Sequence, residues 1–339
     1  MKWGGKQSAY GKSYNIDTPF IYICLLAVSL TFWVVGYVFS IGYPVYGGVL
    51  NTPLWNTVCN ILPNKSIAYG IGLLLTAGGA FLIHRMNYIL AIVREKTLFP
   101  FLFYVLLIST DPDFLPLKST SVGIFCLILA MYQLFISYHE TYAVGKAYNA
   151  ALFMGIGSLF WVHILWFCPL FWVGMYNFKT LNTRTFLASL SGLVTIYWFL
   201  LSWCLFRQDF SPFTVTFAAL LKIGYRPMTG ISPLDWAMIG YVGFLTLISS
   251  VYILTHEHDD TLRSRQYLFF LIMSFFLSFF LFFIYEQSSD ELLAICCMPI
   301  SVLLSHFFTV RKGKKQYWSF NIFIFLYIIL AFVRLWNFL

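Results

Sequence analysis

The chain has 339 residues, of which 60% are hydrophobic, 21% aromatic and only 10% charged. A soluble domain cannot bury so large an apolar fraction, so this composition excludes a water-soluble globule and predicts a membrane protein. The formal net charge of +8 would suggest nucleic-acid binding in a soluble protein, but here the cations fall in short loops between apolar segments, where the positive-inside rule places them. We therefore expect membrane lipids, and no nucleic acid, as partners.

The first third of the chain alternates basic loops with apolar segments. Residues 1–17 form a lysine-bearing leader, and the apolar segment at about 19–40 has the length of a membrane span, which favours a retained anchor over a cleaved signal peptide. A Gly-rich segment at 67–83 predicts close packing between helices. Residues 84–97 form a basic connection with one apolar face, and we expect it to lie in the membrane interface.

The middle of the chain contains the segment on which the topology depends. Short and longer apolar segments at 98–110 and 120–138 precede residues 150–178, which are compatible with one long helix or with two short helices broken near Pro169. If they formed one helix, the basic cluster at 311–315 would lie on the opposite side of the membrane from most other cations, against the positive-inside rule. The charge pattern therefore predicts a hairpin.

The remaining apolar segments complete an all-α polytopic fold. They lie near residues 185–206, 235–255, 267–285, 291–310 and 318–338. In the long outer loop at 207–234, Phe213, Phe217 and Leu220 recur at helical spacing, which predicts an amphipathic helix on the outer leaflet. Residues 18–339 then form one integral-membrane domain of about eleven spanning helices, with the N-terminus inside and the C-terminus outside.

The candidate site lies in the outer loops. Asp111 and Asp113 are candidate catalytic residues because either carboxylate can act as a base for an acceptor hydroxyl, although they can also cap the turn around Pro112 and Pro116. The residues expected to hold the phosphates and head group of a lipid-linked substrate are Lys118, Arg207, Asp209, Lys222 and Arg226. The alternative is that the cations among them anchor the loops to lipid.

Two other patterns suggest chemistry that the spacing does not favour. The run from His256 to Asp260 contains metal-ligand residue types, but contiguous side chains point in different directions, so a solvated helix cap is favoured over a metal site. Ser158 and His163 do not face each other on one helix, so protease chemistry would need His306 from another span. Most cysteines fall in apolar segments, which implies no disulfide framework. We expect no metal and no cofactor.

Three stretches carry a resemblance to a known family: the Arg94-Glu95-Lys96-Thr97 turn before a short span, the outer loop from Asp111 to Lys118, and the run from Ala150 to Phe160. Together they resemble an uncharacterised family of multi-spanning inner-membrane proteins of Bacteroidota-type bacteria. The resemblance covers residues 84–206 best and implies a multi-pass protein of the bacterial inner membrane. The family supplies no established activity.

The layout is also similar to that of envelope enzymes that use polyprenyl-phosphate sugars. Those glycosyltransferases usually carry a catalytic acidic residue in the first outer loop, whereas residues 41–66 contain no Asp or Glu, so Asp111 or Asp113 would have to replace it. The leading hypothesis is an inner-membrane protein of envelope glycan or glycolipid assembly that transfers or polymerises lipid-linked sugars on the outer face.

Two alternatives stay open: a transporter or flippase, and a structural subunit of a larger complex with an unknown membrane-protein partner. The shape of the cavity separates these hypotheses. An outward-open groove with arginine and Asp111 or Asp113 supports the enzyme, and a two-sided pathway supports transport. A solid bundle with an apolar flank supports a subunit.

Overall fold

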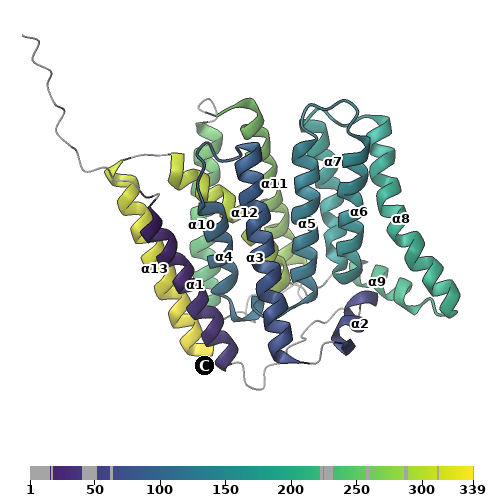
Figure 1. The fold of residues 1–339 in the computed structure, drawn as a ribbon, viewed down its shortest axis with the longest axis horizontal. Coiled ribbons are helices and arrows are strands. Elements are labelled where there is room, and N and C mark those ends of the chain that lie inside the picture. Colours follow the sequence, from purple (N-terminus) through teal and green to yellow (C-terminus); the bar gives the residue numbers. More distant parts are fainter. Residues whose placement is uncertain are drawn as a thin grey trace, which may run out of the picture.

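The computed structural model is a bundle of helices that run roughly parallel and antiparallel to one another (Figure 1). It describes residues 16, 18–39, 52–61, 64–221, 224, 232–256, 260–285, 289–310 and 313–338. Within this part of the chain, 8 helices are long and apolar enough to cross a membrane. They are α1 (Pro19–Phe39), α3 (Lys65–Leu90), α5 (Ser119–Ile136), α8 (Thr183–Arg207), α10 (Pro233–Thr255), α11 (Leu262–Ile284), α12 (Ser289–Val310) and α13 (Lys314–Phe338). The prediction of a polytopic helical membrane protein is confirmed.

Shorter elements fill the spaces between these helices. They are α2 (Pro53–Ile61), α4 (Phe99–Ser109), α6 (Val144–Phe160), α7 (Cys168–Asn177), α9 (Ser211–Leu221) and the 3-10 turns η1 (Pro112–Phe114) and η2 (Val162–Phe167). In Figure 1, α4, α6 and α7 run beside the long helices, while α2 and α9 lie at the lower end of the bundle. We use the terms upper end and lower end as Figure 1 shows them, with the C-terminus at the lower end.

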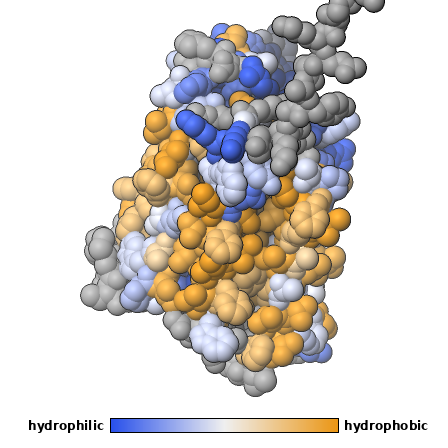
Figure 2. Space-filling view, turned by 90° about the vertical axis from the view of Figure 1, so that its left-hand side faces the viewer, coloured by the Kyte–Doolittle hydropathy of each residue, from blue (hydrophilic) through white to orange (hydrophobic). Residues whose placement is uncertain are grey.

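The bundle is built around α12. Of its apolar span, 83% is buried, which is more than in any other long helix that the structure describes. Aromatic side chains of α4 and α13 pack around the C-terminal half of α12. The ring centroids of Phe308 and Phe323 lie 5.3 Å apart, and those of Phe103 and Phe323 lie 6.0 Å apart. Such ring pairs bury large apolar areas and hold the helices in a fixed relation. The flank seen in Figure 2 is largely apolar, with hydrophilic residues gathered towards the upper end.

Residues 150–178 form the predicted hairpin. Helix α6 ends at Phe160 because Trp161 takes an extended conformation, η2 turns the chain, and α7 leads back. The backbone N–H of His139 donates to the carbonyl oxygen of Phe178 at 3.0 Å, so the end of α7 returns to the loop that precedes α6. The position of the break differs from the prediction: Pro169 lies in the first turn of α7, where its missing N–H leaves no intrahelical partner unsatisfied.

The Gly-rich segment packs as the sequence predicted. A Cβ atom at Gly72 would lie 2.3 Å from the carbonyl oxygen of Leu115, so α3 touches the backbone of the loop after η1 at this point. The expectation for residues 84–97 is wrong, because α3 continues to Leu90 and buries Met86 inside the bundle. Met86, Leu90 and Val93 are buried, so most of the apolar face of this segment packs inside the bundle, whereas Ile89 is exposed.

A helix is present within residues 207–234, as predicted, and forms α9. The rings of Phe213 and Phe217 lie 5.0 Å apart, and Phe217 also contacts Tyr197 of α8 with a centroid distance of 5.3 Å. The Tyr285 hydroxyl at the end of α11 donates to the carbonyl oxygen of Leu220 at 2.8 Å. These contacts hold α9 against the lower end of the bundle.

Candidate functional site

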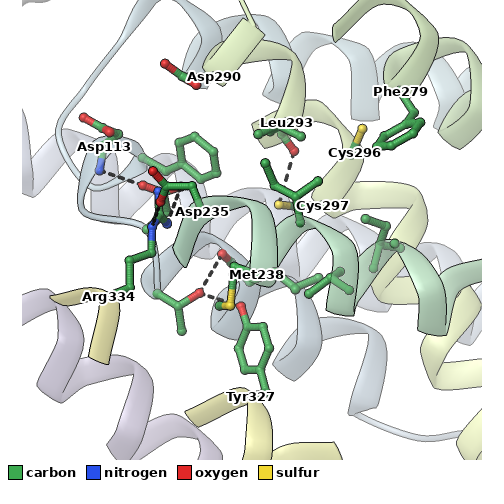
Figure 3. A pocket seen from close by; sticks show the side chains of 18 of the residues that line it. Asp113, Asp235, Met238, Phe279, Asp290, Leu293, Cys296, Cys297, Tyr327 and Arg334 are labelled. Carbon is green, nitrogen blue, oxygen red and sulfur yellow. Dashed lines mark hydrogen bonds and ion pairs between the residues drawn. The ribbon is translucent and has the colours of Figure 1, made fainter. Parts of the chain in front are cut away.

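A cavity of about 170 Å³ opens at the lower end of the bundle, next to the turn η1 (Figure 3). Its walls come from α4, η1, α10, α11, α12 and α13, which lie far apart in the sequence. Its polar residues are Thr110, Asp111, Asp113, Asp235, Asp290, Tyr327 and Arg334. Figure 3 shows Asp113, Asp235, Asp290 and Arg334 at one end of the cavity and Phe279 and Cys296 at the other.

Arg334 is the centre of the polar end. Its Nη1 atom lies 2.8 Å from the Oδ2 atom of Asp111, and its Nε atom donates to the Oδ1 atom of Asp235 at 2.5 Å. The three side chains are 19%, 12% and 30% exposed, respectively, so both ion pairs are shielded from water for most of their surface. A guanidinium group suits this place because its fixed fork of N–H groups can bind two carboxylates at once.

Local structure explains where both carboxylates point. Asp111 is the N-cap of η1 and accepts a hydrogen bond from the backbone N–H of Asp113 at 3.0 Å, so the predicted capping role of Asp111 is confirmed. Asp235 lies in the first turn of α10, where the cap residue Ser232 accepts from its backbone N–H at 3.1 Å. An acidic residue is favoured at this helix position by the cap and the helix dipole.

Asp113, Lys118 and Asp290 form the rim of the site. The Nζ atom of Lys118 lies 3.8 Å from the Oδ1 atom of Asp113, and the Asp113 side chain keeps 31% of its surface exposed. Asp290 begins the apolar span of α12 and is exposed. Four carboxylates therefore meet two cations, Arg334 and Lys118. This excess of negative charge favours hydroxyl or amine groups of a ligand over a phosphate at the rim.

The other end of the cavity is apolar. Met238 and Val242 of α10, Phe275 of α11 and Cys297 of α12 are buried residues that line it. Between the two ends, the hydroxyl groups of Thr110 and Tyr327 form a hydrogen bond of 2.5 Å. The cavity is thus amphipathic: a charged mouth leads into a hydrophobic interior.

The structure brings only some of the predicted site residues together. Asp111, Asp113 and Lys118 share one region, but Arg207 and Asp209 lie at the junction of α8 and α9, on the other side of the bundle (Figure 1). The Arg207 guanidinium lies over the ring of Trp203, 5.0 Å from its centroid, as expected for an anchoring contact. The carboxylate of Asp209 accepts from the backbone N–H of Ser211 at 2.9 Å, and hydrogen bonds from Ser211 lower the pKa of Asp209.

Two predicted site residues, Lys222 and Arg226, lie outside the described residues. So do three members of the run at 256–260. The last member of that run, Asp260, is buried at the upper end and pairs with His306, whose Nε2 atom lies 2.9 Å from its Oδ2 atom. Ser158 is hydrogen-bonded to Gly155 and Tyr197, so it shares no hydrogen bond with either histidine considered for it. Within the described ranges, no three His, Cys, Asp or Glu side chains group closely enough to bind a metal.

Weak signals in the sequence point to the residues that complete the site. Arg334 is an ionisable residue inside an apolar helix, which is typical of a buried functional or structural partner. Asp235 follows a Ser-Pro-Leu stretch that predicts a helix cap. Asp290 lies next to Glu291 at the start of an apolar segment. Which of these acids face Arg334 depends on tertiary packing.

The chain was compared with protein-family models, with curated proteins and with solved structures, and none of the three comparisons finds a match. The chemistry of the site must therefore be judged from its own residues. Asp113 is suited to accept a proton from a bound hydroxyl because its carboxylate is partly exposed at the mouth. Asp111, Asp235 and Arg334 neutralise one another in part and form a fixed wall beside it.

Proposed function

We propose that this protein is an inner-membrane component of envelope glycan or glycolipid assembly, which handles a lipid-linked sugar at the lower-end cavity. The observation that carries the proposal is the amphipathic shape of this cavity, with Asp113 and Asp290 at a polar mouth and a hydrophobic interior behind them. Carboxylates bind sugar hydroxyls, and an apolar interior at membrane depth suits the lipid part of such a substrate. The residues that hold the sugar are Asp113 and Asp290. Arg334 keeps Asp111 and Asp235 in place beside them.

The reaction that this arrangement suits best is glycosyl transfer to a hydroxyl group. In this step the Asp113 carboxylate removes the proton of the acceptor hydroxyl. The oxygen of the acceptor then forms a bond to the anomeric carbon of the sugar, and the bond from that carbon to the oxygen of the lipid phosphate breaks. The phosphate leaves with the electron pair of the broken bond. The layout similarity to polyprenyl-phosphate-sugar enzymes points to the same class of substrate.

A transporter is supported less well, because aromatic rings of the described helices pack above the cavity. Tyr327 lines the cavity, and its ring packs on Phe323 at 6.0 Å. Phe323 in turn packs on Phe308 and Phe103 at 5.3 and 6.0 Å. These rings fill the path from the cavity towards the upper end. The alternative of a structural subunit does not account for the four carboxylates around the cavity.

The proposed topology has eleven crossings, with the lower end outside the cell. Besides the 8 long helices, the crossings are α4, α6 and the unit of η2 and α7. Helix α4 has only 11 residues, so its crossing requires local thinning of the bilayer. The arrangement is supported by the gathering of basic residues in the loops of the upper end, which the positive-inside rule assigns to the cytoplasm.

The proposal is tested by the lipid-linked glycan profile of a strain that lacks this protein. The strain should accumulate a lipid-linked precursor, and the wild-type chain should remove it. The variant Asp113→Asn should leave the precursor in place, because loss of a general base lowers such a rate by about 100-fold or more. Asp209→Asn is the matched control, since it changes an exposed acid at the same end that only caps α9. If Asp113→Asn clears the precursor as the wild type does, the proposed role is wrong.

A further inference from the structure

The hydrophobic end of the cavity lies between two membrane-spanning helices, α10 and α11. Ile239 and Gly243 of α10 and Phe279 of α11 line it and are partly exposed, so the cavity is open towards the flank of the bundle at these residues. The floor is made by Cys297 and Ile300 of α12, which are buried. We call this part of the cavity the lateral groove. At membrane depth, its open side faces lipid hydrocarbon.

The length of the cavity matches one leaflet of a membrane. Along α12 its lining runs from Asp290 to Ile300, which corresponds to about 15 Å of helix at the usual rise per residue. The hydrocarbon core of a bilayer is about 30 Å thick. A chain that enters from the charged mouth would therefore reach the middle of the membrane at the end of the groove.

Gly243 lies on an open part of the groove. A Cβ atom at Gly243 would have no neighbouring atom within 4 Å, and the residue is partly exposed while it lines the cavity. A larger side chain at this position would therefore extend into open space at the edge of the groove. Gly240 also has no atom within 4 Å of its virtual Cβ, but it is exposed on the outside of α10 and does not line the cavity.

One contact between the two helices lies nearer the lower end. The rings of Trp236 and Phe282 make an edge-to-face contact with centroids 6.5 Å apart. Gly243 lies about two helical turns above Trp236, on the open part of the groove. A chain held between α10 and α11 would thus pass behind the Trp236 and Phe282 pair and leave the bundle beside Gly243.

We propose that the lateral groove takes the hydrocarbon chain of the lipid-linked substrate, with Gly243 providing the space through which the chain leaves the bundle. The proposal rests on the proposed function for the identity of the head group, whereas the groove itself is defined by α10, α11 and α12. The hydrocarbon chain lies along Leu293 and Cys297, and the sugar stays at the acidic mouth.

The test uses a polyprenyl-phosphate sugar with a photoactivatable diazirine in its chain, added to the full-length protein in vesicles of phosphatidylethanolamine and phosphatidylglycerol. Irradiation should label peptides of α10 and α11. Gly243→Leu should reduce this labelling roughly tenfold, the effect of excluding about two methylene groups from apolar contact. Gly240→Leu adds the same side chain outside the groove and should leave the labelling unchanged. Ile239→Trp fills the groove from a second position and should act as Gly243→Leu does.

Wild-type labelling in both groove variants would overturn the proposal. Equal labelling by a diazirine-bearing phosphatidylglycerol would also overturn it, since the groove would then hold a bulk membrane lipid. These outcomes are distinct from failure of the proposed function. If the groove variants label normally while Asp113→Asn still accumulates precursor, only the groove is wrong; if they lose labelling while Asp113→Asn clears the precursor, only the proposed chemistry is wrong.

Discussion

Removal of the Arg334 side chain should destabilise the lower end of the bundle. In Arg334→Met, the carboxylates of Asp111 and Asp235 lose a partner that lies 2.8 and 2.5 Å away. Breaking a buried ion pair costs roughly 3–5 kcal/mol. The three side chains are 12–30% exposed, so water recovers part of the loss and we expect about 3 kcal/mol. For a chain of 339 residues that corresponds to a fall in Tm of about 4 °C.

The assay is thermal unfolding of the purified protein in detergent, followed by tryptophan fluorescence. Arg207→Met is the matched control, because Arg207 is exposed and contacts the Trp203 ring, so its loss should change the stability by about 0.5 kcal/mol or less. The double variant Arg334→Met with Asp111→Asn should recover part of the loss, since one uncompensated charge is removed. Equal Tm values for Arg334→Met and Arg207→Met would refute the reasoning.

Three further predictions follow from other contacts. Gly72→Ala should destabilise the protein by about 1–3 kcal/mol, because its Cβ atom would lie 2.3 Å from a backbone oxygen. Gly70→Ala is the control, because its Cβ atom would meet no atom within 4 Å, and it should be neutral or slightly stabilising when both variants are unfolded by heat or denaturant. His306→Phe should lower the Tm by leaving the buried carboxylate of Asp260 unpaired, and adding Asp260→Asn should restore part of it; no recovery in the double variant would contradict the pairing. A protease-sensitive tag inserted near residue 180 should be protected in spheroplasts, whereas a C-terminal tag should be cleaved by added protease; the reverse pattern would invert the proposed topology.

The charge pattern predicted the hairpin at residues 150–178 where apolar composition could not. Hydropathy is high along the whole segment, so it does not distinguish one helix from two. The structure places the break at Trp161 and not near Pro169. Proline is compatible with the first turn of a helix, and the extended Trp161 is held by a hydrogen bond from its indole N–H to Glu291 of α12. A contact between residues so distant in the sequence leaves no local signal.

The candidate site was predictable only in part for the same reason. The acids of η1 stood out because they follow an apolar segment and flank a proline, and the structure places both at the cavity. The arginine beside these acids is not the predicted one. Arg207 lies at the α8 and α9 junction, whereas Arg334 of α13 pairs with Asp111. Spacing along one helix shows which face a residue occupies but not which helix packs against that face.

The most direct test of the account is to identify what occupies the cavity in living cells. A photoactivatable phenylalanine analogue at Phe279 would lie on the lining of the cavity, and the same analogue at Phe276 would lie on the exposed flank of α11. After irradiation and purification, mass spectrometry of the adducts gives the chemical class of each captured molecule. We expect a lipid-linked sugar at Phe279 and only bulk phospholipids at Phe276. Bulk phospholipids alone at both positions would contradict the central claim.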